Sequence, residues 1–184
     1  MRLAMISAGR RKKRIARRRL RTHLGGMSYR VLPIPPETSV AVRQTRLAPG
    51  YGHPVHASTA TSYGPCRSCL ATFRVGAERR LLFTLDAFEG LDSYPSPGPV
   101  FIHEEPCEPW AAEGFPPEVR DLPLVLEGYG RGRHLVARER ASGARVEEAL
   151  ERLFAEPAVE YLHVRNAQAG CYIARVERTA TPPA

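Results

Sequence analysis

Four cysteines and one histidine are the side chains of this sequence best suited to chemistry. Cys66 and Cys69 form a C-x-x-C pair, and Cys107 and Cys171 stand singly further along the chain. A C-x-x-C pair in a turn can supply two ligands to zinc or form a redox couple. The four cysteines would complete a tetrahedral metal site if the fold brought them together, and His103 precedes Cys107 by four residues.

The cysteines also have a simpler interpretation. A strong zinc pattern has two short-spaced ligand pairs, whereas this chain has one pair and two single cysteines. Because free cysteines commonly pack as small buried apolar side chains, we expect no cofactor and no tightly bound metal. One alternative is a structural zinc-binding protein. Another is a thiol-dependent enzyme with Cys66 as nucleophile and His103 as its base, so these patterns do not decide whether the chain is an enzyme.

A second group of candidate residues lies near the C-terminus. Tyr161, His163 and Arg165 alternate along a predicted strand, so they share one of its faces. If this strand forms a hairpin with the stretch that follows, Tyr172 lies opposite Arg165 on the same face. An arginine fork, an imidazole and phenol rings together suit recognition of a carboxylate or phosphate.

The other face of the same hairpin is apolar. It contains Leu162, Val164 and Ile173, and strict alternation would place Ala174 and Val176 with the polar residues instead. The leading functional hypothesis is therefore a binding or regulatory module for a small anionic molecule. Its candidate ligand-binding residues are Arg67, His103, Tyr161, His163, Arg165 and Tyr172, with Arg67 or His103 at the rim.

The elements that must position these residues are mostly strands. Alternation predicts strands at 79–86, 100–103, 122–129, 134–139, 159–166 and 171–177, with a short strand at 29–34 and one helical turn in 116–121. Residues 38–62 contain several prolines and glycines and are predicted to be a loop. This order favours a single α+β domain with a mainly antiparallel sheet.

One principal helix is predicted at 143–155, with Ser142 as its N-cap. Its apolar residues recur at helical spacing, so this helix near the C-terminus is expected to pack on the sheet; they are Val146, Ala149, Leu150, Leu153 and Phe154.

The charge of the chain is unevenly distributed. Of the 27 basic residues, ten lie before Met27, where none of the 19 acidic residues occurs. Residues 27–184 therefore carry 17 basic and 19 acidic residues, a net charge of −2, which does not favour a nucleic-acid surface. Both lysines, Lys12 and Lys13, are in the same basic stretch, so a lysine Schiff base or a P-loop lysine is excluded after Met27.

We divide the chain into a basic leader (1–26), one globular domain (27–179) and a disordered tail (180–184). The leader has three interpretations: a mis-assigned start with Met27 as initiator, a flexible arm that binds nucleic acid or acidic lipid, or a targeting segment. The sequence contains no apolar run of membrane-spanning length and no secretory signal. We therefore expect a cytoplasmic protein with reduced thiols and no membrane partner.

Several stretches together resemble a known family. They are Gly64-Pro65-Cys66-Arg67, Val100-Phe101-Ile102-His103, the run from Leu153 to Asn166, Gly170-Cys171-Tyr172 and Arg175-Val176-Glu177-Arg178. With these residues the sequence resembles the bacterial family catalogued as domain of unknown function 1203. The resemblance covers Met27 to Thr179, is most specific at its C-terminal end, and leaves the basic leader outside. It implies a single soluble bacterial domain and supplies no activity, substrate or catalytic residue.

Overall fold

The structure, a computed structural model, describes residues 28–91 and 94–179. The predicted basic leader (1–26) and tail (180–184) lie outside these residues. Within them the chain is an α+β protein with antiparallel strands and few helices, as the sequence predicts.

The described residues form three helices and eight strands. The helices are α1 (Pro36–Thr45), α2 (Pro117–Arg120) and α3 (Arg145–Ala155). The strands are β1 (Tyr29–Leu32), β2 (His56–Thr59), β3 (Arg79–Asp86), β4 (Pro97–His103), β5 (Leu124–Tyr129), β6 (Leu135–Ala141), β7 (Tyr161–Asn166) and β8 (Tyr172–Arg178).

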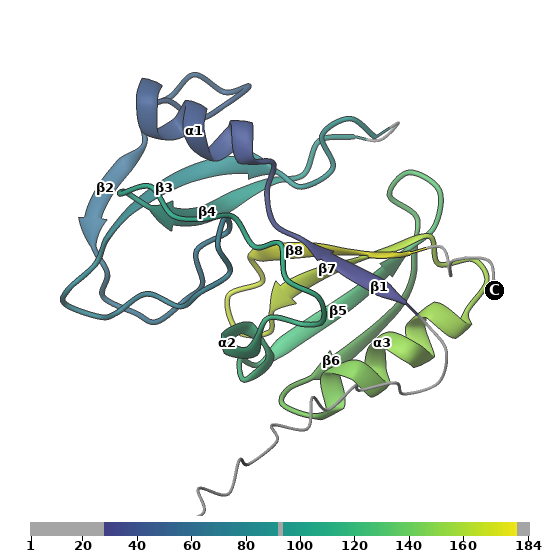
Figure 1. Cartoon of the computed structure of the whole chain (residues 1–184). Coiled ribbons are helices and arrows are strands. Elements are labelled where there is room, and N and C mark those ends of the chain that lie inside the picture. Colours follow the sequence, from purple (N-terminus) through teal and green to yellow (C-terminus); the bar gives the residue numbers. More distant parts are fainter. Residues whose placement is uncertain (1–27, 92–93, 180–184) are drawn as a thin grey trace, which may run out of the picture.

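The strands form two sheets, not the single sheet that we expected. The larger has the order β1-β8-β7-β5-β6 and the smaller the order β2-β3-β4, and every pairing is antiparallel. Figure 1 shows α1 beside the smaller sheet and α3 along the larger one. Each sheet has its own apolar core, so the two must be joined by specific contacts.

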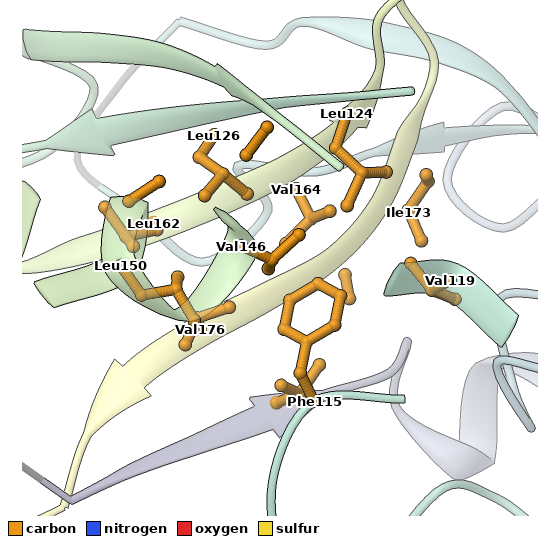
Figure 2. Packing of buried hydrophobic residues seen from close by; sticks show 14 of the residues in the cluster. Phe115, Val119, Leu124, Leu126, Val146, Leu150, Leu162, Val164, Ile173 and Val176 are labelled. Carbon is orange, nitrogen blue, oxygen red and sulfur yellow. The ribbon is translucent and has the colours of Figure 1, made fainter. Parts of the chain in front are cut away.

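The main helix, α3, packs on the larger sheet as predicted. Its five apolar residues at helical spacing are all buried, and they meet side chains from β5, β7 and β8 in one core. Figure 2 shows Val146 and Leu150 of this helix beside Leu126, Leu162 and Val176 of the sheet. Ser142 does not cap the helix, because α3 begins at Arg145 and Ala144 occupies the N-cap position.

The closing hairpin, β7–β8, confirms part of the predicted side-chain pattern. Tyr172 lies opposite Arg165, and the apolar residues Leu162, Val164 and Ile173 are buried in the core under α3. The register shifts between Val164 and Arg165, which brings Ala174 opposite Val164 and Val176 opposite Leu162. The two β8 residues are therefore buried on the helix side, and their predicted place on the polar face is wrong because a bulge interrupts strict alternation.

The smaller sheet is built around β3, where Leu81, Phe83 and Leu85 alternate toward its core. The predicted loop at 38–62 is wrong, because it contains most of α1 and all of β2. Pro36 favours the first turn of α1, and Arg46 in the left-handed region (φ 57°) ends it. Serine, threonine and valine are weak helix formers, and only Ser39 and Val42 of this helix are buried, so its sequence carries little helical signal.

Among the described residues, no helix is both long enough and apolar enough to cross a lipid bilayer.

The packing of α3 can be tested by a single truncation. Leu150 is 0% exposed, so Leu150→Ala should lower the free energy of unfolding by about 2–5 kcal/mol through lost apolar burial and the cavity left behind. Urea denaturation of the wild type and the variant measures the change. A loss below about 0.5 kcal/mol would show that this face of α3 is not packed.

Candidate metal centre

Three cysteines and a histidine meet at one point beside the smaller sheet. They are Cys66, Cys69, His103 and Cys107, and one potential ligand atom from each lies within 4.8 Å of the other three. The Sγ atoms of Cys66 and Cys107 are 3.9 Å apart, and Cys69 Sγ lies 3.5 Å from Nδ1 of His103. Three soft sulfur atoms and one imidazole nitrogen at these separations could hold a metal ion.

The C-x-x-C pair is held in a tight turn between β2 and β3. The backbone N–H of Leu70 donates to the carbonyl of Cys66 (2.9 Å), and the N–H of Cys66 donates to the carbonyl of Ala71 (2.9 Å). Leu70 adopts the left-handed region (φ 58°), which is uncommon for a branched apolar residue. Its side chain is buried in the core of the larger sheet, and this packing holds the unusual conformation of the turn.

The other two ligands come from the end of β4 and the segment that follows it. Pairing of β3 with β4 places His103 opposite Arg80, at the end of the smaller sheet nearest the turn. The backbone N–H of His103 donates to Sγ of Cys66 (3.3 Å). Cys107 lies four positions after His103 in the chain, so a short connection brings it back to the cluster.

Two of the three sulfur atoms in the cluster, those of Cys66 and Cys107, accept hydrogen bonds from nitrogen donors. Cys66 Sγ also accepts from the backbone N–H of Ser68 (3.4 Å), and Cys107 Sγ accepts from Nη2 of Arg43 on α1 (3.3 Å). Donors around sulfur stabilise its deprotonated form, which is the form that binds metal.

The carboxylate of Glu78 contacts His103 at the ring nitrogen that is not directed toward Cys69. Nε2 of His103 lies 3.2 Å from Oε2 of Glu78, and Glu78 itself accepts hydrogen bonds from the backbone N–H (2.8 Å) and Nε (2.9 Å) of Arg74. The ring is therefore oriented with Nδ1 toward the thiols. A carboxylate on the second nitrogen is a common partner of metal-binding histidines, because it fixes the tautomer.

The protonation of the metal-free cluster follows from these contacts. Hydrogen bonds from Cys66 and then Cys69 place the pKa of Cys107 well below the usual range, whereas hydrogen bonds with Cys107 and Cys66 raise the pKa of Cys69. Hydrogen bonds with Cys107 and Cys66 raise the pKa of His103 to about 10. In the metal-free cluster the thiolate of Cys107 thus faces a protonated imidazole, and a bound metal ion would displace the protons of His103 and Cys69.

The fourth ligand differs from the set that the sequence indicated. Cys171 is not in the cluster: its Sγ accepts a hydrogen bond from Nη2 of Arg67 (2.9 Å) at the β7–β8 turn. His103 takes the fourth position. The predicted enzyme pair, Cys66 and His103, does come together, but Cys66 is 0% exposed and offers no sulfur surface to a substrate.

The fold keeps three of the predicted anion-binding residues, Tyr161, His163 and Tyr172, in ring contact, but it does not form the predicted open site. His103 belongs to the cysteine cluster, and Arg67 is buried between the sheets, so neither lies beside His163 on an open face. His163 is itself 0% exposed, and neither ring nitrogen has a hydrogen-bond partner among the residues that the structure describes. Four aromatic rings enclose it at centroid distances of 4.7–5.3 Å: Phe88, Tyr129, Tyr161 and Tyr172. Tyr161 donates its hydroxyl to the carbonyl of Gly132.

Arg165 is already paired with an acid that sequence reasoning missed. Its Nε donates to Glu127 (2.7 Å), which also accepts from Tyr129 (2.6 Å) and pairs with Arg138 (2.9 Å). Burial raises the pKa of Glu127, but the hydrogen bond from Tyr129 and the charge of Arg165 outweigh it and leave this pKa below its usual value. Glu127 thus stays charged and neutralises much of the cationic character expected of this face.

A cavity of about 190 Å³ lies between the sheets and retains two of the predicted residues, Arg165 and Tyr172. Its lining also includes Cys171 and the segment from Ser96 to Pro99. The predicted residues His103, Tyr161 and His163 are not among the described residues that line this cavity.

Comparison with known proteins gives a family and nothing more specific. The family model described as "Protein of unknown function (DUF1203)" matches residues 64–178, which include all four members of the cysteine–histidine cluster. No curated protein and no solved structure matches the chain.

The buried histidine generates a test of stability against pH. Burial, then the charges of Arg165 and Arg175, lower the pKa of His163 to about 3, so the unfolded state binds more protons between about pH 6.5 and pH 3. The stability contributed by the neutral ring is therefore complete above pH 6.5 and is lost as the pH falls toward 3, at up to about 1.4 kcal/mol per pH unit.

The variant His163→Phe removes this titration and fits the aromatic surroundings. Denaturation at pH 7 and pH 4.5 should show a smaller acid-induced loss for the variant than for the wild type. Equal losses in the two proteins would mean that His163 is not buried in the neutral form.

Proposed function

The chain belongs to the DUF1203 family, whose description names no activity, and we propose from its geometry that it is a zinc-binding protein. The observation that carries this proposal is the meeting of Cys66, Cys69, His103 and Cys107, with all four ligand atoms within 4.8 Å of one another. Zinc would be held by three thiolates and one imidazole nitrogen.

Two of the six ligand-atom separations within the cluster match those that zinc imposes. Zn–S bonds of about 2.3 Å and a Zn–N bond of about 2.0–2.1 Å in a tetrahedron set two sulfurs about 3.8 Å apart and sulfur and nitrogen about 3.5 Å apart. The corresponding distances are 3.9 Å for Cys66–Cys107 and 3.5 Å for Cys69–His103. The four ligand atoms, all within 4.8 Å of one another, would have to draw together only where their separations exceed these values.

A structural role is better supported than a catalytic one. A catalytic zinc keeps one position for water or substrate, whereas this site offers four protein ligands. The ligands come from the β2–β3 turn, the end of β4 and the segment after it, and Arg43 of α1 contacts both Cys107 and the carbonyl of His103 (3.1 Å). Zinc at this point would hold three segments and a helix together.

The first test is metal content. Protein purified without chelators should contain one zinc ion per chain by elemental analysis, and Cys66→Ser or Cys69→Ser should lose it. Stripping the metal should lower the melting temperature, because binding energy is part of the folding energy at a structural site.

Cys171→Ser is the matched control for this test. It removes the same atom type at a position where sulfur contacts Arg67, so it should retain the zinc. Wild-type protein that binds no zinc after reconstitution under reducing conditions would refute the proposal, as would equal zinc loss in all three variants.

The second test concerns the carboxylate behind His103. Glu78→Gln should weaken zinc affinity by about 10–100-fold, because the amide cannot match the charged hydrogen bond that orients the imidazole. Competition with a chromophoric chelator measures the affinity.

Glu118→Gln provides the comparison for Glu78→Gln. Its carboxylate accepts from the backbone N–H of Thr72 (2.8 Å), near the same turn, but contacts none of the four ligands. It should bind zinc like the wild type. Unchanged affinity in Glu78→Gln, or an equal loss in Glu118→Gln, would show that the Glu78–His103 contact does not support the site.

A further inference from the structure

The helix α1 is weakly anchored by its own packing. Of its ten residues only Ser39 and Val42 are buried, and no side chain caps its first turn. An isolated helix of this length is marginal in water, so contacts with the rest of the protein must hold it in place. The helix lies beside the smaller sheet, away from α3 (Figure 1).

The polar side-chain contacts that hold α1 all end in one short segment, residues 103–107. Nε of Arg43 donates to the carbonyl of His103 (3.1 Å), and Nη2 donates to Sγ of Cys107 (3.3 Å). Arg46, which ends the helix, pairs with Glu104 (2.8 Å). Within the described residues, the other side-chain hydrogen bonds of α1 stay inside the helix or reach the residue just after its end.

The same segment carries two of the four proposed zinc ligands, His103 and Cys107, one at each end. His103 is also held by the pairing of β4 with β3, whereas Cys107 lies in no strand or helix. The sulfur of Cys107 is 3.9 Å from that of Cys66, and sulfur makes only weak hydrogen bonds. A zinc ion would fix Cys107 beside the C-x-x-C turn, and with it one of the two acceptors of Arg43.

We propose that zinc binding and the docking of α1 are coupled through Arg43, so that loss of the metal releases this helix while the larger sheet and α3 stay folded. The inference rests on the proposed zinc site. The core of the larger sheet contains no residue of α1 and none of the four ligands, so it depends directly on neither. Such coupling is reciprocal, so the docked helix raises the zinc affinity by the factor by which zinc favours docking.

Release of α1 would change the surface of the protein. Val42 is 0% exposed and belongs to the core of the smaller sheet. Val40 of the same helix and Leu47 just after it are already exposed, at 47% and 43%. The metal-free protein would therefore present an apolar surface that the zinc-bound protein partly covers, and zinc would act as a conformational switch.

The experiment compares the full chain loaded with zinc and the same chain stripped by a chelator, both under reducing conditions. Hydrogen–deuterium exchange is followed by peptide mass spectrometry. The amides of α1 should exchange about 5–150-fold faster without zinc, the usual range of coupling between two sites, while those of α3 and β7 keep their protection.

The outcomes separate this inference from the zinc site itself. A chain that binds zinc but shows equal exchange of α1 with and without it overturns the coupling and leaves the zinc site standing. Equal loss of protection in α1 and α3 also overturns it, since zinc would then support the whole fold. A chain that binds no zinc refutes both proposals.

Variants of Arg43 test the route of the coupling. Arg43→Met should weaken zinc affinity by about 10–100-fold, as is typical for a residue that supports a metal ligand, and α1 should exchange rapidly even with zinc bound. Arg43→Lys keeps the charge and one donor, so its losses should be smaller. Wild-type zinc affinity in a folded Arg43→Met chain overturns the role of Arg43.

Arg152→Met is the matched control. Arg152 lies on α3 and pairs with Glu139 (2.8 Å), and in the described part of the chain it contacts none of the four ligands. Zinc affinity and the exchange of α1 should both stay as in the wild type, and losses equal to those of Arg43→Met would overturn the assignment. If Arg43→Met does not fold, the wild type with and without zinc still decides.

Discussion

The buried guanidinium of Arg67 is the constraint on which the rest of the arrangement depends. Each sheet has its own apolar core, and Arg67 lies where they meet. Its backbone N–H donates to Phe101 of β4 (2.9 Å), its carbonyl accepts from Ile34 in the connection between β1 and α1 (3.0 Å), and its side chain reaches β8. A charge in this position cannot be left unpartnered, so all of these segments must be in place together.

The residues on either side of Arg67 explain why the turn has its shape. Cys66 and Cys69 face the candidate metal site, Arg67 extends toward β8, and Leu70 packs into the core of the larger sheet. Successive side chains therefore enter three different environments. A turn that must do this cannot relax into a regular strand or helix, and it is held by the close hydrogen bonds between Cys66, Leu70 and Ala71.

Elements with a strong apolar period were predictable from the sequence. The boundaries of β3 agree with the prediction, and the strand pairs β5–β6 and β7–β8 and the helix α3 lie within a few residues of it. The helix α1 was missed because its weak helix formers bury only one face of limited width. The faces of β8 were partly wrong because a bulge is set by packing against β7, which leaves no local mark in the sequence.

The candidate metal site was half predictable, for a related reason. The C-x-x-C spacing marks two ligands, because both are close in the chain. The other two depend on the pairing of β4 with β3, which brings His103 to the turn, and Glu78 lies 25 residues from the histidine it contacts. Cys171 and His103 were both plausible as fourth ligand by residue type. Only the three-dimensional path of the chain distinguishes them.

The contrast between Cys171 and the clustered cysteines shows one residue type in two different surroundings. In the cluster, three sulfurs and an imidazole stand close enough to share one cation, and the proposed zinc would neutralise their charge. At Cys171 the sulfur accepts a hydrogen bond from the guanidinium of Arg67, and the residue lines the cavity between the sheets. Because Arg67 is the neighbour of Cys66 in the chain, the geometry of the cluster also positions the guanidinium. The turn therefore sets where Arg67 can reach, both beside the cluster and toward Cys171.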